Sequence, residues 1–353
     1  MQYKKVKLKL KLNEENRFIG ITMGDPGGIG PEIAIKSVKH FIDEDEYIKP
    51  VIFGSFENIE YTSRNIIKID TPVNLIKPDL PINYAYQTGK INVIDLASKS
   101  YAQVKRGYVN HTYAKDVEKF IETAVNFSVK EKILGFATAP INKDMMLKGG
   151  ARFGGHTELL GYLAGSDDFA MLFYSDKLIT ILSTIHIPIS AVPAKITKDL
   201  LRKIIKISFD WLKIDLGKNS PNIAVLGLNP HAGENGRIGN EEKEIIVPVI
   251  EEFKNYKENI AGPFPADSFF AEKYKKFDLI VAMYHDQALI PFKLLSFHKG
   301  VNVTAGLKFI RTSPVHGTAY DIAGKNRADC GSMIEAIKLV GRISENRKRW
   351  KER

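Results

Sequence analysis

Apolar, β-rich runs alternate with helical stretches along nearly the whole of this 353-residue chain. Such alternation is typical of α/β proteins, in which helices cover the faces of a largely parallel sheet. We expect buried strands at residues 18–22, 50–53, 134–138, 169–174, 177–182, 222–227 and 279–282. We expect helices at residues 31–41, 113–129, 198–212, 241–257 and 330–347.

The length and composition indicate a globular protein of two domains. A chain of 353 residues is long for a single core, and its 44% hydrophobic and 26% charged content is ordinary. No flexible linker separates the halves, so we expect two tightly joined lobes with more than one chain crossing. The longest apolar runs are too short for a membrane span, and the single cysteine, Cys330, fits a reducing cytoplasm.

The net charge of +10 does not indicate a nucleic-acid partner. A nucleic-acid binder gathers its cationic side chains in one patch with interleaved aromatics, whereas here lysines are scattered among acidic residues. A cationic cleft would instead favour a small anionic substrate. Residues 4–12 alternate basic and apolar side chains and predict a short edge strand or a frayed extension, with no targeting signal.

A glycine-rich loop, GDPGGIGPE at residues 24–32, follows the first expected strand. Its glycines allow a close backbone approach, and Pro31 suits the first position of a helix. The loop lacks the glycine spacing of the dinucleotide-binding fingerprint. We expect it to lie next to a ligand, and a plain tight turn is the alternative.

Three histidines, His186, His231 and His285, follow expected strands. Three imidazoles brought together from separate loops would bind a divalent metal and leave positions open for substrate. The alternative for each is an ordinary hydrogen-bonded histidine. The carboxylates Glu234 and Asp286 lie close by in the sequence.

The densest group of polar residues lies between residues 284 and 324. Lys293, Asn302 and Arg311 are spaced through a loop-rich segment and are suited to hold a multiply charged anion. His316 and Asp321 follow in a glycine-containing turn. Earlier in the chain, Thr157 of GGHTELL is expected to cap a helix whose first N–H groups face an anion, with His156 beside it, and Lys143 follows another strand.

Several of these segments together resemble one enzyme family. GDPGGIGPEI, APINK, GGHTELL, LNPHAGENGRIGNEE, GPFPADSFF, YHDQALIPFK and VNVTAGLKFIRTS occur in the order and spacing of the 4-hydroxythreonine-4-phosphate dehydrogenases. The resemblance covers roughly residues 17–345. It implies the isocitrate/isopropylmalate dehydrogenase-like fold, with two α/β/α sandwich domains, an inter-domain cleft and a homodimer whose active sites lie at the subunit interface.

The resemblance also implies a reaction and a set of site residues. The family oxidises 4-phosphooxy-L-threonine with NAD and a divalent metal (zinc, magnesium or cobalt), and the resulting 3-oxo acid loses CO2. The metal ligands correspond to His186, His231 and His285. The substrate contacts correspond to His156, Thr157, Lys293, Asn302 and Arg311. We predict a cofactor-binding domain from residues 1–137 and 301–353, and a metal, substrate and dimerisation domain from residues 138–300.

The turn at residues 314–325 departs from the family pattern. Lys308 replaces a proline and Val315 replaces an aspartate, and the turn resembles the adenosine-binding loop of the wider decarboxylating-dehydrogenase superfamily. That match implies NAD contacts from His316, Gly317, Thr318 and Asp321. Asp321 would favour NAD over NADP, because a carboxylate repels a 2′-phosphate. In that superfamily an asparagine contacts the adenine, and the corresponding position of this chain is Asp329. The resemblance therefore does not assign an adenine contact here.

The sequence does not decide between three candidates for the general base, Lys143, Asp267 and Asp286. Two alternative functions stay open at this point. One is a related dehydrogenase of another four-carbon phosphorylated acid such as erythronate 4-phosphate. The other is a metal-dependent phosphohydrolase, which would have no use for the cofactor turn.

Overall fold

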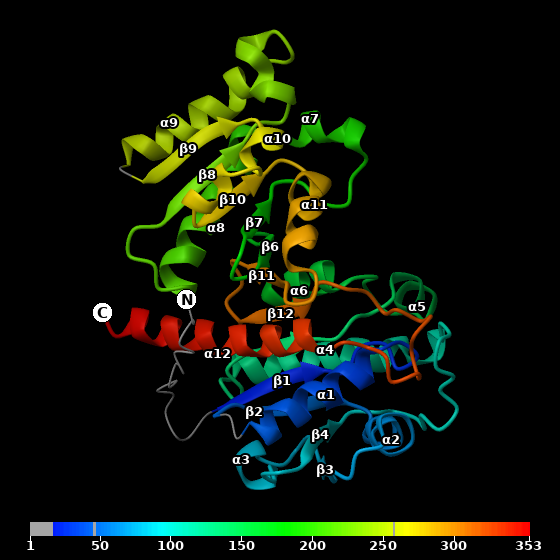
Figure 1. The fold of residues 1–353 in the computed structure, drawn as a ribbon. Helices are drawn as coiled ribbons and strands as arrows, with labels where there is room; N and C mark the ends of the chain where they lie inside the picture. Colours follow the sequence, from blue (N-terminus) through cyan, green and yellow to red (C-terminus); the bar gives the residue numbers. More distant parts are fainter. Residues whose placement is uncertain (1–16, 45–46, 257) are drawn as a thin grey trace, which may run out of the picture.

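The computed structural model describes residues 17–44, 47–256 and 258–353, and in these ranges one 12-stranded sheet runs through the molecule (Figure 1). The expected α/β class is confirmed. The strand expected at residues 4–12 lies outside the described residues. The order across the sheet is β3-β4-β2-β1-β5-β12-β11-β6-β7-β10-β8-β9. The strands are β1 (Phe18–Thr22), β2 (Lys49–Gly54), β3 (Val73–Ile76), β4 (Ile91–Asp95), β5 (Phe136–Thr138), β6 (Ala170–Tyr174), β7 (Ile179–Leu182), β8 (Asn222–Leu226), β9 (Asn259–Phe264), β10 (Leu279–Ala282), β11 (Val301–Ala305) and β12 (Arg311–Pro314).

The two halves of the sheet are parallel within themselves but run in opposite directions. β3, β4, β2, β1, β5 and β12 form one parallel set, and β7, β10, β8 and β9 form the other. Three successive antiparallel pairings, β12 with β11, β11 with β6 and β6 with β7, reverse the direction between them. The carboxyl ends of the two sets therefore lie at opposite edges of the sheet. The loops that follow the strands of the two sets therefore do not all converge on one crevice.

Five helical regions were expected with bounds from the sequence, and the helices pack against this sheet (Figure 1). All five expected helical regions are present, two of them continued by π-helical turns. The helices are α1 (Gly30–Asp43), α2 (Phe56–Tyr61), η1 (Thr62–Ile67), α3 (Ile82–Ala85), η2 (His111–Tyr113), α4 (Ala114–Val129), α5 (Lys143–Lys148), α6 (His156–Ala164), η3 (Ile189–Ala191), α7 (Val192–Lys195), α8 (Lys198–Asp210), η4 (Trp211–Asp215), η5 (Pro230–Gly236), η6 (Glu242–Ile246), α9 (Val247–Asn255), α10 (Ala266–Phe269), η7 (Lys273–Lys276), α11 (His285–Ser296) and α12 (Gly331–Lys351). In the described part of the chain, no helix combines the length and apolar character needed to cross a bilayer.

The strands β3, β4, β9, β11 and β12 were not expected from the sequence. In β11, β12 and the unexpected helix α11, polar residues or a proline interrupt the apolar pattern. β11 contains Asn302 and β12 begins with Arg311, so neither segment reads as a buried strand. α11 contains Pro291, which normally argues against a helix interior. All three elements border the central strands. The predicted domain boundaries at residues 137/138 and 300/301 fall beside this same central region and stay a prediction.

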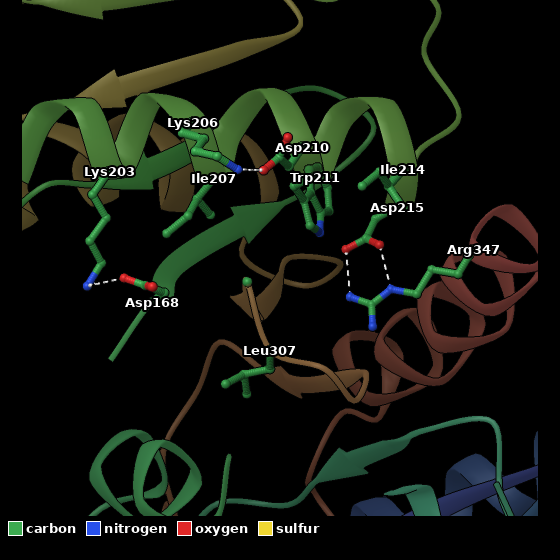
Figure 2. Close-up of a pocket in the computed structure, with 11 residues that line it drawn as sticks. Asp168, Lys203, Lys206, Ile207, Asp210, Trp211, Ile214, Asp215, Leu307 and Arg347 are labelled. Carbon is green, nitrogen blue, oxygen red and sulfur yellow. Dashed lines mark hydrogen bonds and ion pairs between the residues drawn. The ribbon is translucent and has the colours of Figure 1, made fainter. Parts of the chain in front are cut away.

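A cavity of about 520 Å³ lies between α8, η4, the loop after β11 and α12 (Figure 2). Trp211 of η4, which lines this cavity, packs its ring against that of Tyr174 on β6. Tyr174 lies on the opposite face of the sheet from its neighbour Phe173. Each cationic side chain that lines this cavity faces a carboxylate, so the charges there are compensated within the protein. The pairs are Lys203–Asp168 at 3.7 Å, Lys206–Asp210 at 2.5 Å and Arg347–Asp215 at 2.6 Å.

The Arg347–Asp215 pair joins α12 to η4 and is the best-enclosed ion pair of this cavity. The guanidinium donates from Nε and Nη2 to the two carboxylate oxygens at 2.6 and 3.1 Å. The Asp215 side chain is 6% exposed, whereas the Lys206 and Asp210 side chains are 74% and 49% exposed. Removing one partner of such a bidentate pair is destabilising, because it leaves the other charge buried without a counter-ion.

We predict that Arg347→Met destabilises the protein by about 3 kcal/mol, because it leaves the buried Asp215 carboxylate without its cation. The control, Lys206→Met, removes an exposed pair and should cost below about 0.5 kcal/mol. Chemical denaturation followed by circular dichroism measures both free energies of unfolding. Equal effects of the two substitutions would contradict this assignment.

Candidate active site

A second cavity of about 450 Å³ lies against the face of the central strands. Its floor comes from β5, β6, β11 and β12, where Asn302 pairs in register with Ser313 on one side and Phe173 on the other. Residues from α6 and α11 and from the loops after β5, β7 and β12 complete the wall. Ten of the site residues expected from the sequence line this cavity: Lys143, His156, Thr157, His186, His285, Lys293, Asn302, Arg311, His316 and Gly317.

Arg311 is a buried cation at the floor of the cavity. It is 3% exposed, and its guanidinium donates to the hydroxyl of Thr138 from Nε and Nη2 and to the hydroxyl of Thr304 from Nη1, at 2.7–3.2 Å. Within the described ranges no carboxylate pairs with it, and burial lowers its pKa to about 9. A guanidinium enclosed without a counter-ion is costly, and an anion entering the cavity would remove that cost.

His156 lies next to Arg311 at the start of α6. Burial, and after it the positive charge of Arg311, hold the pKa of His156 well below its usual 6.5, so the imidazole is neutral at physiological pH. The expectation that Thr157 caps this helix is wrong, because α6 begins at His156 and its N-cap is Gly155, which has no side chain to cap with. The first N–H groups of α6 are therefore left without a side-chain cap beside the cavity.

Three buried polar atoms on the cavity wall have no hydrogen-bond partner among the described residues. They are Nε2 of His156, Oδ1 of Asn302 and Nε2 of His316. Buried polar groups are normally paired, and each unpaired one costs about 1–3 kcal/mol. All three residues line the same cavity as Arg311, whose charge favours an anion, so the cavity is suited to a polar molecule that carries an anionic group.

His186 and His285 lie together at one end of the cavity, with ring centroids 5.9 Å apart. His285 Nδ1 lies 2.6 Å from Oδ1 of Asp286, a contact that fixes the ring and leaves Nε2 for another partner. In the part of the chain that the structure describes, however, no group of three or more histidine, cysteine or carboxylate side chains is arranged to hold a metal. Within one chain, His186 and His285 are thus adjacent, but the third predicted ligand does not join them.

The third predicted ligand, His231, lies outside the cavity on an exposed turn after β8. Residues 231–235 all have left-handed backbone angles, with φ between 43° and 76°. Such angles cost roughly 1–2 kcal/mol for each residue other than glycine. The buried Glu242 holds the start of this turn, because its Oε1 accepts the backbone N–H groups of Leu228 and Asn229 at 2.8 and 2.7 Å. Glu242 thus holds the start of a strained turn on which His231 is exposed.

The three candidates for the general base occupy different places. Lys143 begins α5 and lines the cavity. Asp286 is exposed and is bonded to His285, and Asp267 lies exposed on α10 and does not line the cavity. Among the three, Lys143 is the side chain placed to reach a substrate in this cavity of a single chain.

The predicted cofactor turn leads from the cavity to the surface. His316 and Gly317 line the cavity, and Gly317 has open space on the side where a side chain would extend. Thr318 and Asp321 lie beyond it, and the Asp321 residue is exposed while its carbonyl accepts from Lys325 Nζ at 2.7 Å. Val315 also lines the cavity. A turn that runs from a cavity to an exposed carboxylate fits a long ligand with one reactive end.

The glycine-rich loop at residues 24–32 does not line the cavity. A methyl group on Gly24, Gly27, Gly28 or Gly30 would come within 2.3–2.9 Å of backbone oxygens of Pro140, Tyr108, Thr318 and Met23, respectively. The expectation that these glycines allow a ligand to approach is therefore corrected, because the protein's own backbone fills the space beside each one.

Comparison with known proteins agrees with this architecture. The family model described as Pyridoxal phosphate biosynthetic protein PdxA matches residues 46–340, which is most of the chain. The chain belongs to this family. It is 41% identical over 327 residues to 4-hydroxythreonine-4-phosphate dehydrogenase of Aquifex aeolicus, covering 92% of this chain and 98% of that protein. It is 39% identical over 332 residues to D-threonate 4-phosphate dehydrogenase of Pectobacterium atrosepticum, covering 93% and 100%.

Solved structures show the same fold. The crystal structure of 4-hydroxythreonine-4-phosphate dehydrogenase from Klebsiella pneumoniae matches with a TM-score of 0.83 at 36% identity, covering 95% of this chain and 100% of that one. A terephthalate 1,2-cis-dihydrodioldehydrogenase from Burkholderia xenovorans matches with a TM-score of 0.63 at 25% identity, covering 92% and 98%. This PdxA-family chain is therefore an oxidoreductase, a dehydrogenase by family.

Sequence reasoning missed the hydroxyl groups that hold Arg311. Thr138 and Thr304 are ordinary β-strand residues with no motif around them, and β12 itself was not expected. A signal was nevertheless present, because an arginine between apolar residues in the sequence FIRTSP needs buried acceptors when the segment is a central strand.

We predict that His156 stays neutral well below pH 6.5, and that Arg311→Met raises its pKa by removing a neighbouring positive charge. Burial is the larger cause, so the pKa should remain below 6.5 in the variant. Nuclear magnetic resonance titration of labelled histidine measures both values. An unchanged pKa, or one above 6.5, would contradict the described environment of this ring.

The same lowered pKa predicts the direction of one contribution to stability. The unfolded chain binds a proton on this histidine near pH 6.5, whereas the folded chain does so only at lower pH. The contribution of His156 to stability is therefore present above pH 6.5 and is lost as the pH falls toward the folded value.

Proposed function

We propose that this PdxA-family protein oxidises 4-phosphooxy-L-threonine with NAD and a divalent metal, giving 2-amino-3-oxo-4-phosphooxybutanoate. That acid then decarboxylates to 3-amino-2-oxopropyl phosphate, a step in pyridoxal 5′-phosphate biosynthesis. The names of the relatives support the dehydrogenase and its substrate class. The observation that carries the proposal is the buried, uncompensated Arg311 at the floor of the cavity.

The cavity supplies what a small phosphorylated acid needs. Arg311 offers a fork of donors, and Lys293, which lines the same cavity from α11, offers a mobile cation. The side-chain NH2 of Asn302 and the uncapped start of α6 can add neutral N–H donors in the same cavity. Phosphate and carboxylate on one substrate would thus each find positive or donor groups across the cavity.

The reaction removes a proton from the C3 hydroxyl and a hydride from C3. A divalent metal on histidine ligands supplies Lewis-acid chemistry, because it lowers the pKa of the hydroxyl and stabilises negative charge on that oxygen. Lys143 is our candidate to accept the proton from the hydroxyl. Asp286 orients the His285 ring through its contact at Nδ1. Neutral His156 can donate one hydrogen bond to the bound anion without adding a charge.

NAD would bind along the turn that starts at His316 and Gly317. Its nicotinamide end would enter the cavity, and the adenosine ribose would lie beside Asp321. The exposed carboxylate can accept hydrogen bonds from the ribose hydroxyls and would repel a 2′-phosphate, so we expect NAD to be preferred to NADP.

We further propose that a second copy of the chain completes the metal site by supplying His231. One chain brings His186 and His285 together, and His231 lies outside their cavity on an exposed turn. Exposed apolar side chains surround the histidine pair, as expected of a surface that is covered in a dimer. They are Ile187, Ile189, Ile290, Leu294 and Phe297, which are 36–81% exposed.

Dehydrogenation of D-threonate 4-phosphate is a second candidate. Relatives with this name are about as similar to the chain as those named for 4-hydroxythreonine-4-phosphate, at 39% and 39–41% identity. The two substrates differ at C2, where one has an amino group and the other a hydroxyl group. The cavity described above recognises the anionic groups that both substrates share, so kinetics must separate them.

Reduction of NAD, followed at 340 nm in the presence of a divalent metal, tests the proposed substrate. We expect kcat/KM to be highest for 4-phosphooxy-L-threonine and at least about tenfold lower for D-threonate 4-phosphate and erythronate 4-phosphate. A higher value for D-threonate 4-phosphate would establish the second candidate instead. Release of inorganic phosphate without NADH would establish a phosphohydrolase and contradict both.

Subunit complementation tests the shared metal site. His186→Ala and His231→Ala should each be inactive alone, but a mixed dimer has one site with all three histidines. Random mixing should therefore restore about a quarter of wild-type activity. The control mixture, His186→Ala with His285→Ala, should restore no activity. His186 and His285 of each site come from the same chain, so every site of the mixed dimer lacks one of them. No restoration in the first mixture, or a monomeric active enzyme, would contradict the proposal.

A further inference from the structure

The glycine-rich loop and α1 lie against the predicted cofactor turn, although almost 300 residues separate them in the sequence. Hydrogen bonds join the two segments at successive points along the turn. They are Ile29 N to Thr318 O at 3.0 Å, Tyr320 Oη to Asp25 Oδ2, Gly324 N to Glu32 Oε1 at 2.6 Å and Lys36 Nζ to Ala328 O at 2.8 Å.

Glycines make this close contact possible. A methyl group on Gly28 would lie 2.9 Å from the carbonyl oxygen of Thr318, and one on Gly27 would lie 2.4 Å from that of Tyr108. Gly27 O also accepts from Gly107 N at 2.9 Å. Any other residue at Gly27 or Gly28 would push these segments apart, so the loop is shaped to hold protein backbone.

Asp25 connects the cofactor turn to the substrate cavity. Its backbone N–H donates to the carbonyl of Pro140, a residue that lines the cavity, at 2.9 Å. Its side chain is buried, and Oδ1 accepts from Gly27 N at 2.8 Å while Oδ2 accepts from the hydroxyl of Tyr320. One residue therefore bonds to both the wall of the cavity and the middle of the turn.

Glu32 holds the far end of the same turn. The residue is 2% exposed, and its Oε1 accepts the backbone N–H of Gly324. It lies in the first turn of α1, where the helix dipole favours a negative charge. Gly324 has a φ of 79° and lies against Arg106, so the end of the turn is held from two sides.

We propose that Asp25 and Glu32 are positioning residues that fix the turn from Thr318 to Gly324 relative to the substrate cavity. Neither residue lines the cavity, and both bond to the turn. Their effect is to set the distance between Asp321, beside the cofactor ribose, and the cavity that receives the nicotinamide. This inference rests on the cofactor site assigned under the proposed function and explains why the glycine-rich loop is needed there.

Tyr320→Phe is the sharpest test, because it removes one hydroxyl and leaves Asp25 bonded to Gly27. We expect the KM for NAD, and the Kd for NADH from fluorescence titration, to rise about fivefold. The KM for the phosphorylated substrate should stay within about twofold, since the cavity itself is unchanged. The matched control is Tyr101→Phe, which removes a hydroxyl bonded to the Asp116 carboxylate at 3.1 Å and should leave both KM values unchanged.

Three outcomes would overturn the inference. An unchanged KM for NAD in Tyr320→Phe would show that the bond does not position the turn. An equal rise in both KM values, or an equal effect of Tyr101→Phe, would show a general loss of structure. Asp321→Ala, measured beside them, separates this inference from the proposed function. If Asp321→Ala weakens NAD binding and Tyr320→Phe does not, the positioning role alone fails. If Asp321→Ala has no effect on NAD, the assigned cofactor site fails.

Discussion

A guanidinium group that is 3% exposed, with no carboxylate paired to it among the described residues, is the constraint around which the cavity is organised. Two threonine hydroxyls accept hydrogen bonds from Arg311 but do not neutralise its charge. Keeping a charge in this state requires a rigid support, and the register of the central strands supplies it by placing Thr138 and Thr304 on either side. The free energy lost in burying the cation is recovered when an anion binds, which turns an unfavourable feature of the free protein into affinity.

The reversal of strand direction explains where the cavity lies. In a sheet with one direction, loops at the carboxyl ends of the strands form the ligand site. Here β11 and β6 lie between two opposed parallel sets, and side chains of β5, β6, β11 and β12 form the floor. The cavity in Figure 2 differs from the one that contains Arg311. Each of its cationic side chains is paired with a carboxylate, so none of these charges is left to bind a ligand.

The α/β class, five helical regions and seven strands were predicted correctly from the sequence. These elements have a regular apolar pattern, and that pattern indicates which residues are buried. The sequence-based prediction missed β3, β4 and β9, and it also missed β11, β12 and α11, where polar residues or a proline interrupt the apolar pattern. The identity of the polar residues around the cavity could be predicted from their density and spacing. Their partners could not, since Thr138 meets Arg311 only through the sheet register. The role of the glycines at residues 24–30 was misjudged, because glycine is needed both where another backbone segment packs closely and where a ligand does. The sequence alone does not distinguish these two cases.

Substitution of Arg311 by lysine tests the central claim most directly. Lysine keeps the charge but cannot reproduce a fork of donors anchored on two hydroxyls. For the phosphorylated substrate, the account predicts a rise in KM of about tenfold or more, with a thermal unfolding midpoint close to that of the wild type. It also predicts that the wild type uses the dephosphorylated substrate poorly. An unchanged KM in Arg311→Lys, or equal use of the dephosphorylated substrate by the wild type, would contradict it.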